Sequence, residues 1–125
     1  MDKDLIWIGS SRKDIRHFPE PVKDDIGFAL RQIQKGKSLL CTKPWKGLGP
    51  RVLEVLEDFD GDTYRAVYTV KFDEVVYALH CFQKKSKKSV ETPPRDKDLV
   101  AVRLKQAEAH YKANYRQEKR GYENG

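Results

Sequence analysis

The chain has 125 residues, which suits a single domain large enough to bury a core without disulfides or a structural metal. Its formal net charge of +6 at pH 7 favours an acidic partner: nucleic acid, an anionic membrane or an acidic protein. Two cysteines without C-x-x-C spacing and three scattered histidines argue against a disulfide framework and a zinc site. The first residues resemble no signal peptide and no stretch approaches the length of a membrane span, so we expect a cytoplasmic protein without metal or cofactor.

The first part of the chain predicts a strand and two helices. Residues 5–9 (LIWIG) are an apolar run that ends at glycine, as expected of a strand. Residues 10–18 predict a short helix, with a serine three residues before Asp14 as in a capping box and a proline after its end. Residues 20–36 predict a longer helix with a proline in its first turn and a glycine at its end. Its apolar stripe consists of Val22, Ile26, Ala29, Leu30 and Ile33.

Three strands are expected to follow. Residues 37–50 contain two prolines and two glycines, which favours an irregular connection. Residues 51–59 and 63–72 predict a hairpin around the turn pair at positions 60–61, Asp-Gly. Residues 75–83 are apolar at nearly every position, as in a central strand covered on both faces.

The last predicted element is a helix over residues 92–115, which begins at a Thr-Pro pair. Its apolar stripe consists of Val100, Leu104, Ala107, Tyr111 and Tyr115. The order β-α-α-β-β-β-α predicts an α+β fold, a small antiparallel sheet with its helices packed on one face. We expect one domain over residues 1–115 and a polar tail over residues 116–125.

The strand expected at 63–72 has two faces of different character. The more apolar face predicts the core and consists of Tyr64, Ala66, Tyr68, Val70 and Phe72. The other face predicts a solvent-exposed, basic surface and consists of Arg65, Val67, Thr69 and Lys71. Taken alone, Tyr68 is typical of a core residue and Arg65 of a surface charge.

A lysine-rich segment follows the third strand, where residues 80–88 have the sequence HCFQKKSKK. Lysines at a strand end can simply keep a sheet edge soluble. Arg65 lies on the neighbouring strand, however, so its planar fork and the mobile charges of Lys84 and Lys85 would together suit phosphate oxygens. Lys43 and Lys46 of the irregular connection would form a rim, and Trp45 and Phe82 are candidates to stack on bases, although Trp45 suits a core edge equally well.

His80 is the one histidine close to this basic segment, and it could shuttle protons, although a single histidine within a strand is more often structural. The common catalytic motifs are missing: the sequence has no G-x-S-x-G, no P-loop, no H-E-x-x-H and no G-x-G-x-x-G. The acidic residues Glu54, Glu57 and Asp58 are typical of a solvated hairpin end.

Three stretches together carry a family resemblance: KPWKGLGPRVLEV (43–55), YRAVYTV (64–70) and VVYALHCFQKKSKKSVETPPRDKDLVAVRLKQA (75–107). The chain resembles the RelE/ParE superfamily of bacterial toxins over roughly residues 5–110, and within it the HigB-like, phage-derived branch. The resemblance implies a RelE-like fold and the toxin of a type II toxin–antitoxin system. It also implies an antitoxin partner, often of helix-turn-helix type, and metal-independent cleavage of mRNA on the ribosome. Operator DNA would be bound only through the complex with the antitoxin.

By this resemblance Arg65 matches the arginine that faces the scissile phosphate, and Lys84 or Lys85 matches the basic position at the end of the last strand. RelE has lysines where this chain has Glu54 and Leu56, and a tyrosine where this chain has residues 90–92. Acid and base roles would therefore pass to Tyr68, His80 or a lysine.

Two other functions share this fold: inhibition of a topoisomerase by protein contact, as in ParE-like toxins, and nucleic-acid binding without catalysis. The residues expected to act in catalysis are Arg65, Lys84, Lys85, His80 and Tyr68. Those expected to bind RNA are Lys43, Lys46, Lys71, Lys87 and Lys88.

Overall fold

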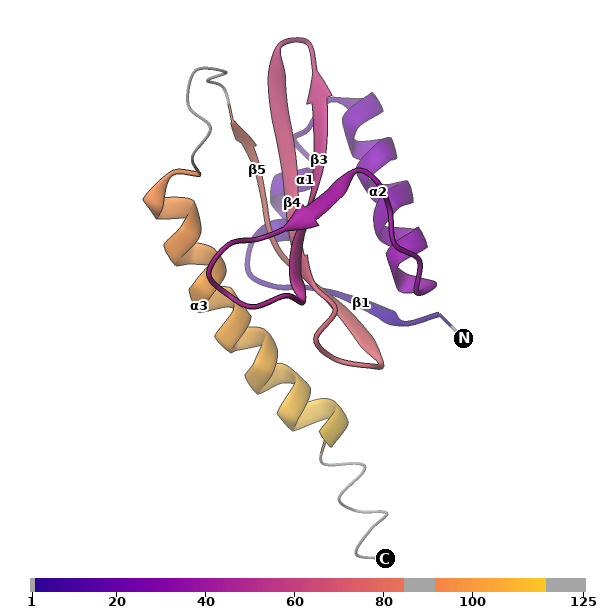
Figure 1. Cartoon of the computed structure of the whole chain (residues 1–125), viewed down its shortest axis with the longest axis vertical. Coiled ribbons are helices and arrows are strands. Elements are labelled where there is room, and N and C mark those ends of the chain that lie inside the picture. Colours follow the sequence, from indigo (N-terminus) through magenta and orange to yellow (C-terminus); the bar gives the residue numbers. More distant parts are fainter. Residues whose placement is uncertain (1, 85–91, 117–125) are drawn as a thin grey trace, which may run out of the picture.

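A computed structural model describes residues 2–84 and 92–116 of the chain (Figure 1). The strands are β1 (Asp4–Trp7), β2 (Thr42–Pro44), β3 (Val52–Phe59), β4 (Asp62–Thr69) and β5 (Val75–Lys84). The helices are α1 (Ser11–Ile15), α2 (Glu20–Gln34) and α3 (Pro94–Tyr111), which continues into the short π-helical segment η1 (Lys112–Arg116).

The strands form one sheet in the order β1-β5-β4-β3-β2. Strands β2 to β5 are antiparallel as expected, but β1 runs parallel to β5, with Leu5 beside Val76. No tight turn links β1 to β5, because α1, α2 and three other strands come between them in the chain, and a parallel pair requires such a long connection. The predicted antiparallel sheet is therefore confirmed for β2 to β5 and wrong for β1. Strand β2 lies within the connection that we expected to be irregular and pairs with β3, Thr42 beside Val55.

The expected hairpin is present between β3 and β4. Asp60 and Gly61 both have positive φ, 50° and 88°, as a two-residue turn of the primed type requires. The long helix also forms as expected: all five residues of the predicted stripe of α2 are buried. Gly36, at φ 85°, follows the end of α2 in the left-handed conformation that glycine adopts without strain.

The helices cover both faces of the sheet, not one. Figure 1 shows α2 on one side of the strands and α3 on the other. One core lies under α1 and α2 and includes Ile26, Tyr68 and Val76, and a second lies under α3 and includes Val67, Tyr77 and Val100. The α+β class is confirmed, but helices on one face were a wrong prediction, because the terminal helix buries the face of β4 that we expected to be wet.

That face of β4 is buried rather than basic and open. Arg65 is 7% exposed, and Val67 and Thr69 are fully buried. The opposite face of β4 carries Tyr64, Ala66 and Tyr68 in the other core, as predicted. Phe72 lies beyond the end of the strand and packs in the core under α3.

An irregularity in the β4–β5 pairing decides which side chains lie under α3. Val67 pairs with His80 but Tyr68 pairs with Ala78, so Leu79 is an extra residue of β5. Leu79 lies in the core under α3, and His80 bonds to residues of α3, so two consecutive side chains serve the same face. The bulge thus places His80, and with it Phe82, on the face under α3, where the Phe82 ring stacks on the imidazole at 4.8 Å.

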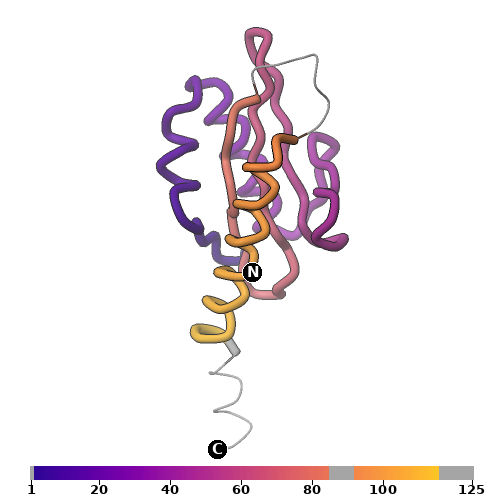
Figure 2. Tube along the Cα trace, turned by 90° about the vertical axis from the view of Figure 1, so that its left-hand side faces the viewer, coloured from indigo at the N-terminus to yellow at the C-terminus, as the bar shows by residue number. Residues whose placement is uncertain are grey.

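Figure 2 shows the final turns of helix α3 running past the strands. Aromatic residues cover this end: Tyr111 stacks on Phe72 at 4.2 Å and on Tyr115 at 5.3 Å. Hydrogen bonds from Tyr111 to Glu74 and from Tyr115 to Asp4 anchor the helix end. The other end of α3, at Pro94, lies beside the end of β5 (Figure 1), and the candidate site lies there.

Candidate active site at the end of the sheet

Arg65 is the central side chain of the candidate site. It lies on β4 between Leu56 of β3 and Phe82 of β5. Its Nη1 is 3.2 Å from Glu54 Oε1 and donates a second hydrogen bond, also 3.2 Å, to Thr92 Oγ1. Its Nε is buried and has no hydrogen-bond partner among the described residues. The guanidinium is thus held in a fixed orientation while one of its donors remains unused by the described part of the chain.

Glu54 is the partner that sequence reasoning did not expect. Its side chain is almost fully buried rather than solvated at a hairpin end. Burial raises the pKa of Glu54 above its ordinary value, while the charges of Arg65, Lys43 and Lys84 act in the opposite direction. A buried carboxylate costs little only when it is paired, so Glu54 and Arg65 hold each other in place.

Two lysines border this pair. Lys43 of β2 lies opposite Glu54 in the β2–β3 pairing, and Lys84 lies opposite Thr63 at the end of β5. Lys43 is exposed and Lys84 is partly buried. We refer to Arg65, Glu54, Thr92, Lys43 and Lys84 as the Arg65 cluster.

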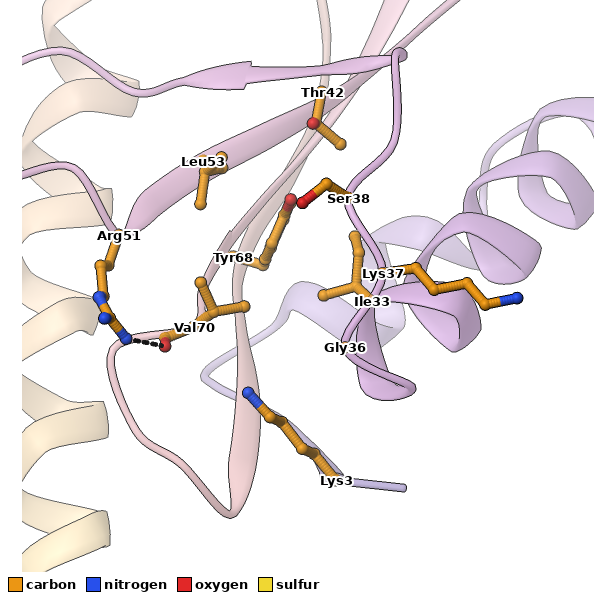
Figure 3. Close-up of a pocket in the computed structure, with 10 residues that line it drawn as sticks. All are labelled: Lys3, Ile33, Gly36, Lys37, Ser38, Thr42, Arg51, Leu53, Tyr68 and Val70. Carbon is orange, nitrogen blue, oxygen red and sulfur yellow. Dashed lines mark hydrogen bonds between the residues drawn. The ribbon is translucent and has the colours of Figure 1, made fainter. Parts of the chain in front are cut away.

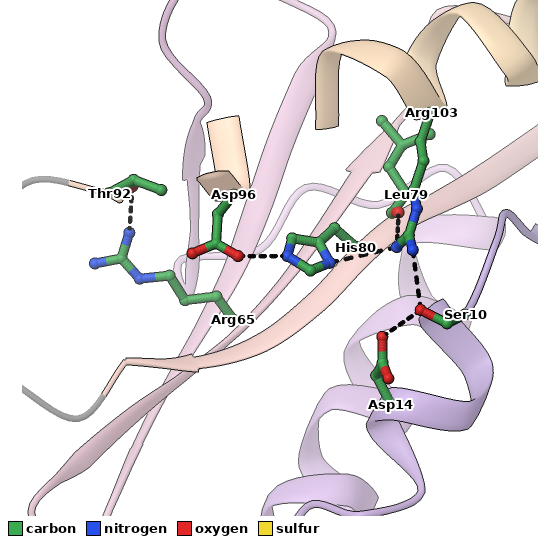
Figure 4. A network of polar contacts seen from close by, with 8 residues as sticks. All are labelled: Ser10, Asp14, Arg65, Leu79, His80, Thr92, Asp96 and Arg103. Atoms are coloured by element: carbon green, nitrogen blue, oxygen red, sulfur yellow. Dashed lines mark hydrogen bonds and ion pairs between the residues drawn. The ribbon is translucent and has the colours of Figure 1, made fainter. Parts of the chain in front are cut away.

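His80 lies one step along the same face, and both of its ring nitrogens are engaged (Figure 4). Nε2 is 2.7 Å from Asp96 Oδ1, and Nδ1 is 3.3 Å from Arg103 Nη1. A guanidinium can only donate, so Nδ1 accepts and Nε2 carries the hydrogen that it donates to Asp96. This arrangement fixes the tautomer of His80 and leaves the ring without a nitrogen directed at a substrate.

Arg103 links three elements through this network. Its Nη1 donates to the carbonyl oxygen of Leu79 at 3.0 Å, and its Nη2 donates to Ser10 Oγ at 2.9 Å. Ser10 in turn donates to Asp14 Oδ2 at 2.7 Å, an arrangement in place of the predicted capping box. We call Asp14, Ser10, Arg103, His80 and Asp96 the Arg103 network, and it fastens α3 to β5 and to the start of α1.

Gly9 makes room for Arg103. It has φ 59°, and a Cβ at this position would be 2.7 Å from Arg103 Nε. A larger residue would therefore be strained in its backbone and would collide with the guanidinium.

Two of the other predicted site residues that the structure describes, Tyr68 and Lys71, lie away from Arg65. Tyr68 lies on the opposite face, where burial raises the pKa of its phenol, so the structure does not bring it together with Arg65. Lys71 pairs with Glu108 of α3 and lies 5.8 Å from the ring of Phe72, at the far end of β4.

Lys46 is exposed in the loop after β2, whereas Trp45 before it is buried and packs edge-on against Phe82, so it belongs to the core. The predicted site residues Lys85, Lys87 and Lys88 lie outside the described residues. Within residues 2–84 and 92–116, no group of three or more His, Cys, Asp or Glu side chains is placed to hold a metal ion. In the same part of the chain, no helix is both long and apolar enough to cross a membrane.

Sequence reasoning missed Glu54, Thr92, Asp96 and Arg103. Arg103 had a detectable signal, because it occupies the buried stripe of α3 together with Val100, Leu104 and Ala107. A cation at such a position requires partners in the core.

The family model described as phage derived protein Gp49-like (DUF891) matches residues 13–105, well over half of the chain. The chain belongs to this phage-derived family. No curated protein sequence matches this chain.

Among solved structures, the fold is similar to that of E. coli toxin RelE in the free state, in a mutant with two arginines replaced by alanine. The TM-score is 0.56 and the sequence identity is 17%, and the match covers 85% of this chain and 98% of that one. A second similar structure is the toxin-antitoxin complex RelBE2 from Mycobacterium tuberculosis, with a TM-score of 0.49 and 15% identity over 67% of this chain and 100% of that one. The family model and the RelE-like fold confirm the resemblance that the sequence indicated.

Proposed function

We propose that this protein is the toxin of a type II toxin–antitoxin system and that it cleaves mRNA on the ribosome. The observation that carries the proposal is Arg65, a buried and oriented guanidinium with a donor that the described residues leave unused. It lies on the strand next to β5, after which the sequence continues into a run of lysines. Membership of the phage-derived family and the RelE-like fold support a toxin.

In the proposed reaction, the 2′-hydroxyl of a ribose attacks the adjacent phosphorus and the bond to the 5′-oxygen breaks. The products are a cyclic phosphate and a free 5′-hydroxyl, so one proton leaves the 2′-oxygen and one reaches the 5′-oxygen. Arg65 stabilises the charge that develops on the phosphoryl oxygens, and a preorganised donor of this kind is worth on the order of 10²–10³ in rate. DNA is inert because it lacks the attacking hydroxyl.

Glu54 is a positioning residue in this scheme, because it contacts Arg65 rather than the substrate. Proton transfer, worth roughly 10²–10⁴ in rate, falls to Lys84 or Lys85. Lys84 belongs to the Arg65 cluster. Tyr68 lies on the other face, and the ring nitrogens of His80 are both engaged. Lys43 and Lys46 would contact the RNA backbone.

The proposed partner is an antitoxin that covers Arg65, Lys84 and Lys85 with acidic or hydrogen-bonding groups and carries a helix-turn-helix for operator DNA. A basic surface on a chain of charge +6 favours rapid association with such a partner. The toxin would act in the cytoplasm, where ribosomes translate.

One observation favours a second function. Glu54 already neutralises Arg65 within the protein, as expected if the arginine only stabilises the fold. The toxin would then act by protein contact, for example on a topoisomerase.

Expression without the antitoxin, followed by primer-extension mapping of mRNA ends, distinguishes the two functions. The cleavage proposal expects new mRNA ends and growth arrest, both lost in Arg65→Ala. Because Arg65→Ala leaves Glu54 buried without its partner, the double variant Arg65→Met/Glu54→Met is the matched control for folding. If folded variants without Arg65 remain toxic and no new mRNA ends appear, the protein-contact function is supported and cleavage is refuted.

A further inference from the structure

A pocket on the other face of the sheet is not used by the proposed reaction. It has a volume of about 190 Å³ and lies between the end of α2, the loop before β2, and strands β3 and β4 (Figure 3). Its lining residues are Lys3, Ile33, Gly36, Lys37, Ser38, Thr42, Arg51, Leu53, Tyr68 and Val70. Tyr68 belongs to the core under α2, whereas Arg65 faces α3, so the sheet separates this pocket from the Arg65 cluster.

The charges of the lining have one sign. Three lining residues are cationic, Lys3, Lys37 and Arg51, and none is acidic. Figure 3 shows the amino group of Lys3 reaching towards Val70, the guanidinium of Arg51 beside Val70, and Lys37 extending away from the pocket. Arg51 is held in this position by a contact of 3.5 Å from its Nη1 to the carbonyl oxygen of Val70. An anionic group is therefore the complementary ligand.

The interior of the pocket is partly apolar. Ile33, Leu53 and Val70 supply aliphatic surface, and Ser38, Thr42 and Tyr68 supply hydroxyl groups. A bare phosphate would leave the aliphatic surface uncovered. The volume is also below the roughly 300–1,000 Å³ of ordinary small-molecule sites, so the pocket suits one or two side chains rather than a nucleotide. The ring of Tyr68 is buried and offers no open face on which a base could stack.

An exposed apolar residue lies beside the pocket. Leu40 is fully exposed, and it lies in the loop between the lining residues Ser38 and Thr42. This loop is held as a tight turn, since the Thr42 hydroxyl donates to the carbonyl oxygen of Leu39 at 2.7 Å. Leu40 therefore adds exposed apolar surface at the rim of the pocket, next to the aliphatic part of its lining.

We propose that this pocket binds a peptide segment of a protein partner, in which an aliphatic side chain is flanked by carboxylates. The aliphatic group packs on Ile33, Leu53 and Val70, and the carboxylates pair with Lys3 and Arg51. An antitoxin is a natural source of such a segment, and in that respect the inference rests on the proposed function. A partner held here contacts the toxin without covering the Arg65 cluster, so this site serves attachment rather than inhibition.

The test is an NMR titration of the full-length, ¹⁵N-labelled chain with a capped Glu-Leu-Glu tripeptide. We expect shift changes at the amides of Gly36, Ser38 and Leu53, and much weaker ones with capped Gln-Leu-Gln. Exposed ion pairs each change an equilibrium by about 1.4- to 5-fold, so Lys3→Gln/Arg51→Gln should weaken binding by about 2- to 25-fold. The charge-preserving swap Lys3→Arg/Arg51→Lys should retain binding.

Lys13→Gln/Lys105→Gln is the matched control, because it removes two exposed charges outside the pocket lining and should leave binding unchanged. Equal binding of the Gln peptide, shift changes confined to other residues, or equal occupancy of the pocket by inorganic phosphate or a short RNA would each overturn the proposal. Primer extension with Lys3→Gln/Arg51→Gln tests mRNA cleavage independently of peptide binding in the pocket. This variant should cut mRNA as the unsubstituted chain does, and a loss of cutting in both chains would refute cleavage while leaving the peptide result unaffected.

Discussion

Replacing Arg103 with methionine should remove the attachment of α3 to the sheet. The substitution keeps the aliphatic length but deletes hydrogen bonds to Leu79, His80 and Ser10 at 3.0, 3.3 and 2.9 Å. Hydrogen bonds from a charged group contribute roughly 1.5–3 kcal/mol each, and the three are not additive because they share one guanidinium. We therefore expect the free energy of unfolding to fall by about 3–5 kcal/mol, a large part of the roughly 5–15 kcal/mol typical of a domain.

Thermal and urea unfolding followed by circular dichroism measure this change. At roughly 3–5 °C per kcal/mol for a chain of this size, the melting temperature should fall by about 10–20 °C. Lys105→Met is the control, since Lys105 is exposed on the same helix and its replacement should change stability by less than about 0.5 kcal/mol. If Arg103→Met lowers stability by no more than the control does, the reasoning on the Arg103 network is refuted.

Three further predictions concern the backbone, the acidity of one carboxyl and the metal requirement. Gly9→Ala should destabilise the fold by about 1–3 kcal/mol in the same unfolding assays, because of its positive φ and its collision with Arg103; a neutral effect would contradict the 2.7 Å approach. Burial, and then the hydrogen bond and charge of Asp25, raise the pKa of Glu57 to about 7 from an ordinary value of 4.5. The contribution of Glu57 to the free energy of unfolding is present below pH 4.5 and is lost as pH rises through about 7. Glu57→Gln should therefore reduce the loss of stability over this pH range, and equal dependence of stability on pH in the two proteins would contradict the raised pKa. Cleavage in a reconstituted translation system should persist at chelator concentrations that leave ribosomes intact; loss that added magnesium restores would refute metal independence.

The sequence predicted the local elements of this fold well because their signals are local. The stripe of α2 repeats at helical spacing, and the Asp60-Gly61 pair has a backbone preference that specifies its turn. Long-range features had no such signal. The parallel pairing of β1 and the side on which α3 packs depend on which apolar surfaces meet in three dimensions.

The candidate site shows the same division. Arg65 was predicted from its place in the YR stretch, but its partner Glu54 was interpreted as a solvated acid, because only the strand register places it beside the guanidinium. The extra residue at Leu79 could not be read from a run of apolar letters, and it determines that His80 faces α3. Tyr68 follows the alternation of β4, which assigns it to the face away from Arg65.

The most direct test of the central claim is the rate of mRNA cleavage on purified ribosomes programmed with a defined message, measured in a single turnover. Arg65→Gln removes the charge that is proposed to stabilise the phosphoryl oxygens, and Arg12→Gln removes an exposed arginine charge outside the cluster as a control. We expect Arg65→Gln to lower the rate by about 10²–10³ and Arg12→Gln to leave it nearly unchanged. A folded Arg65→Gln protein that cleaves at the unsubstituted rate, or an unsubstituted chain that does not cleave, would contradict the central claim.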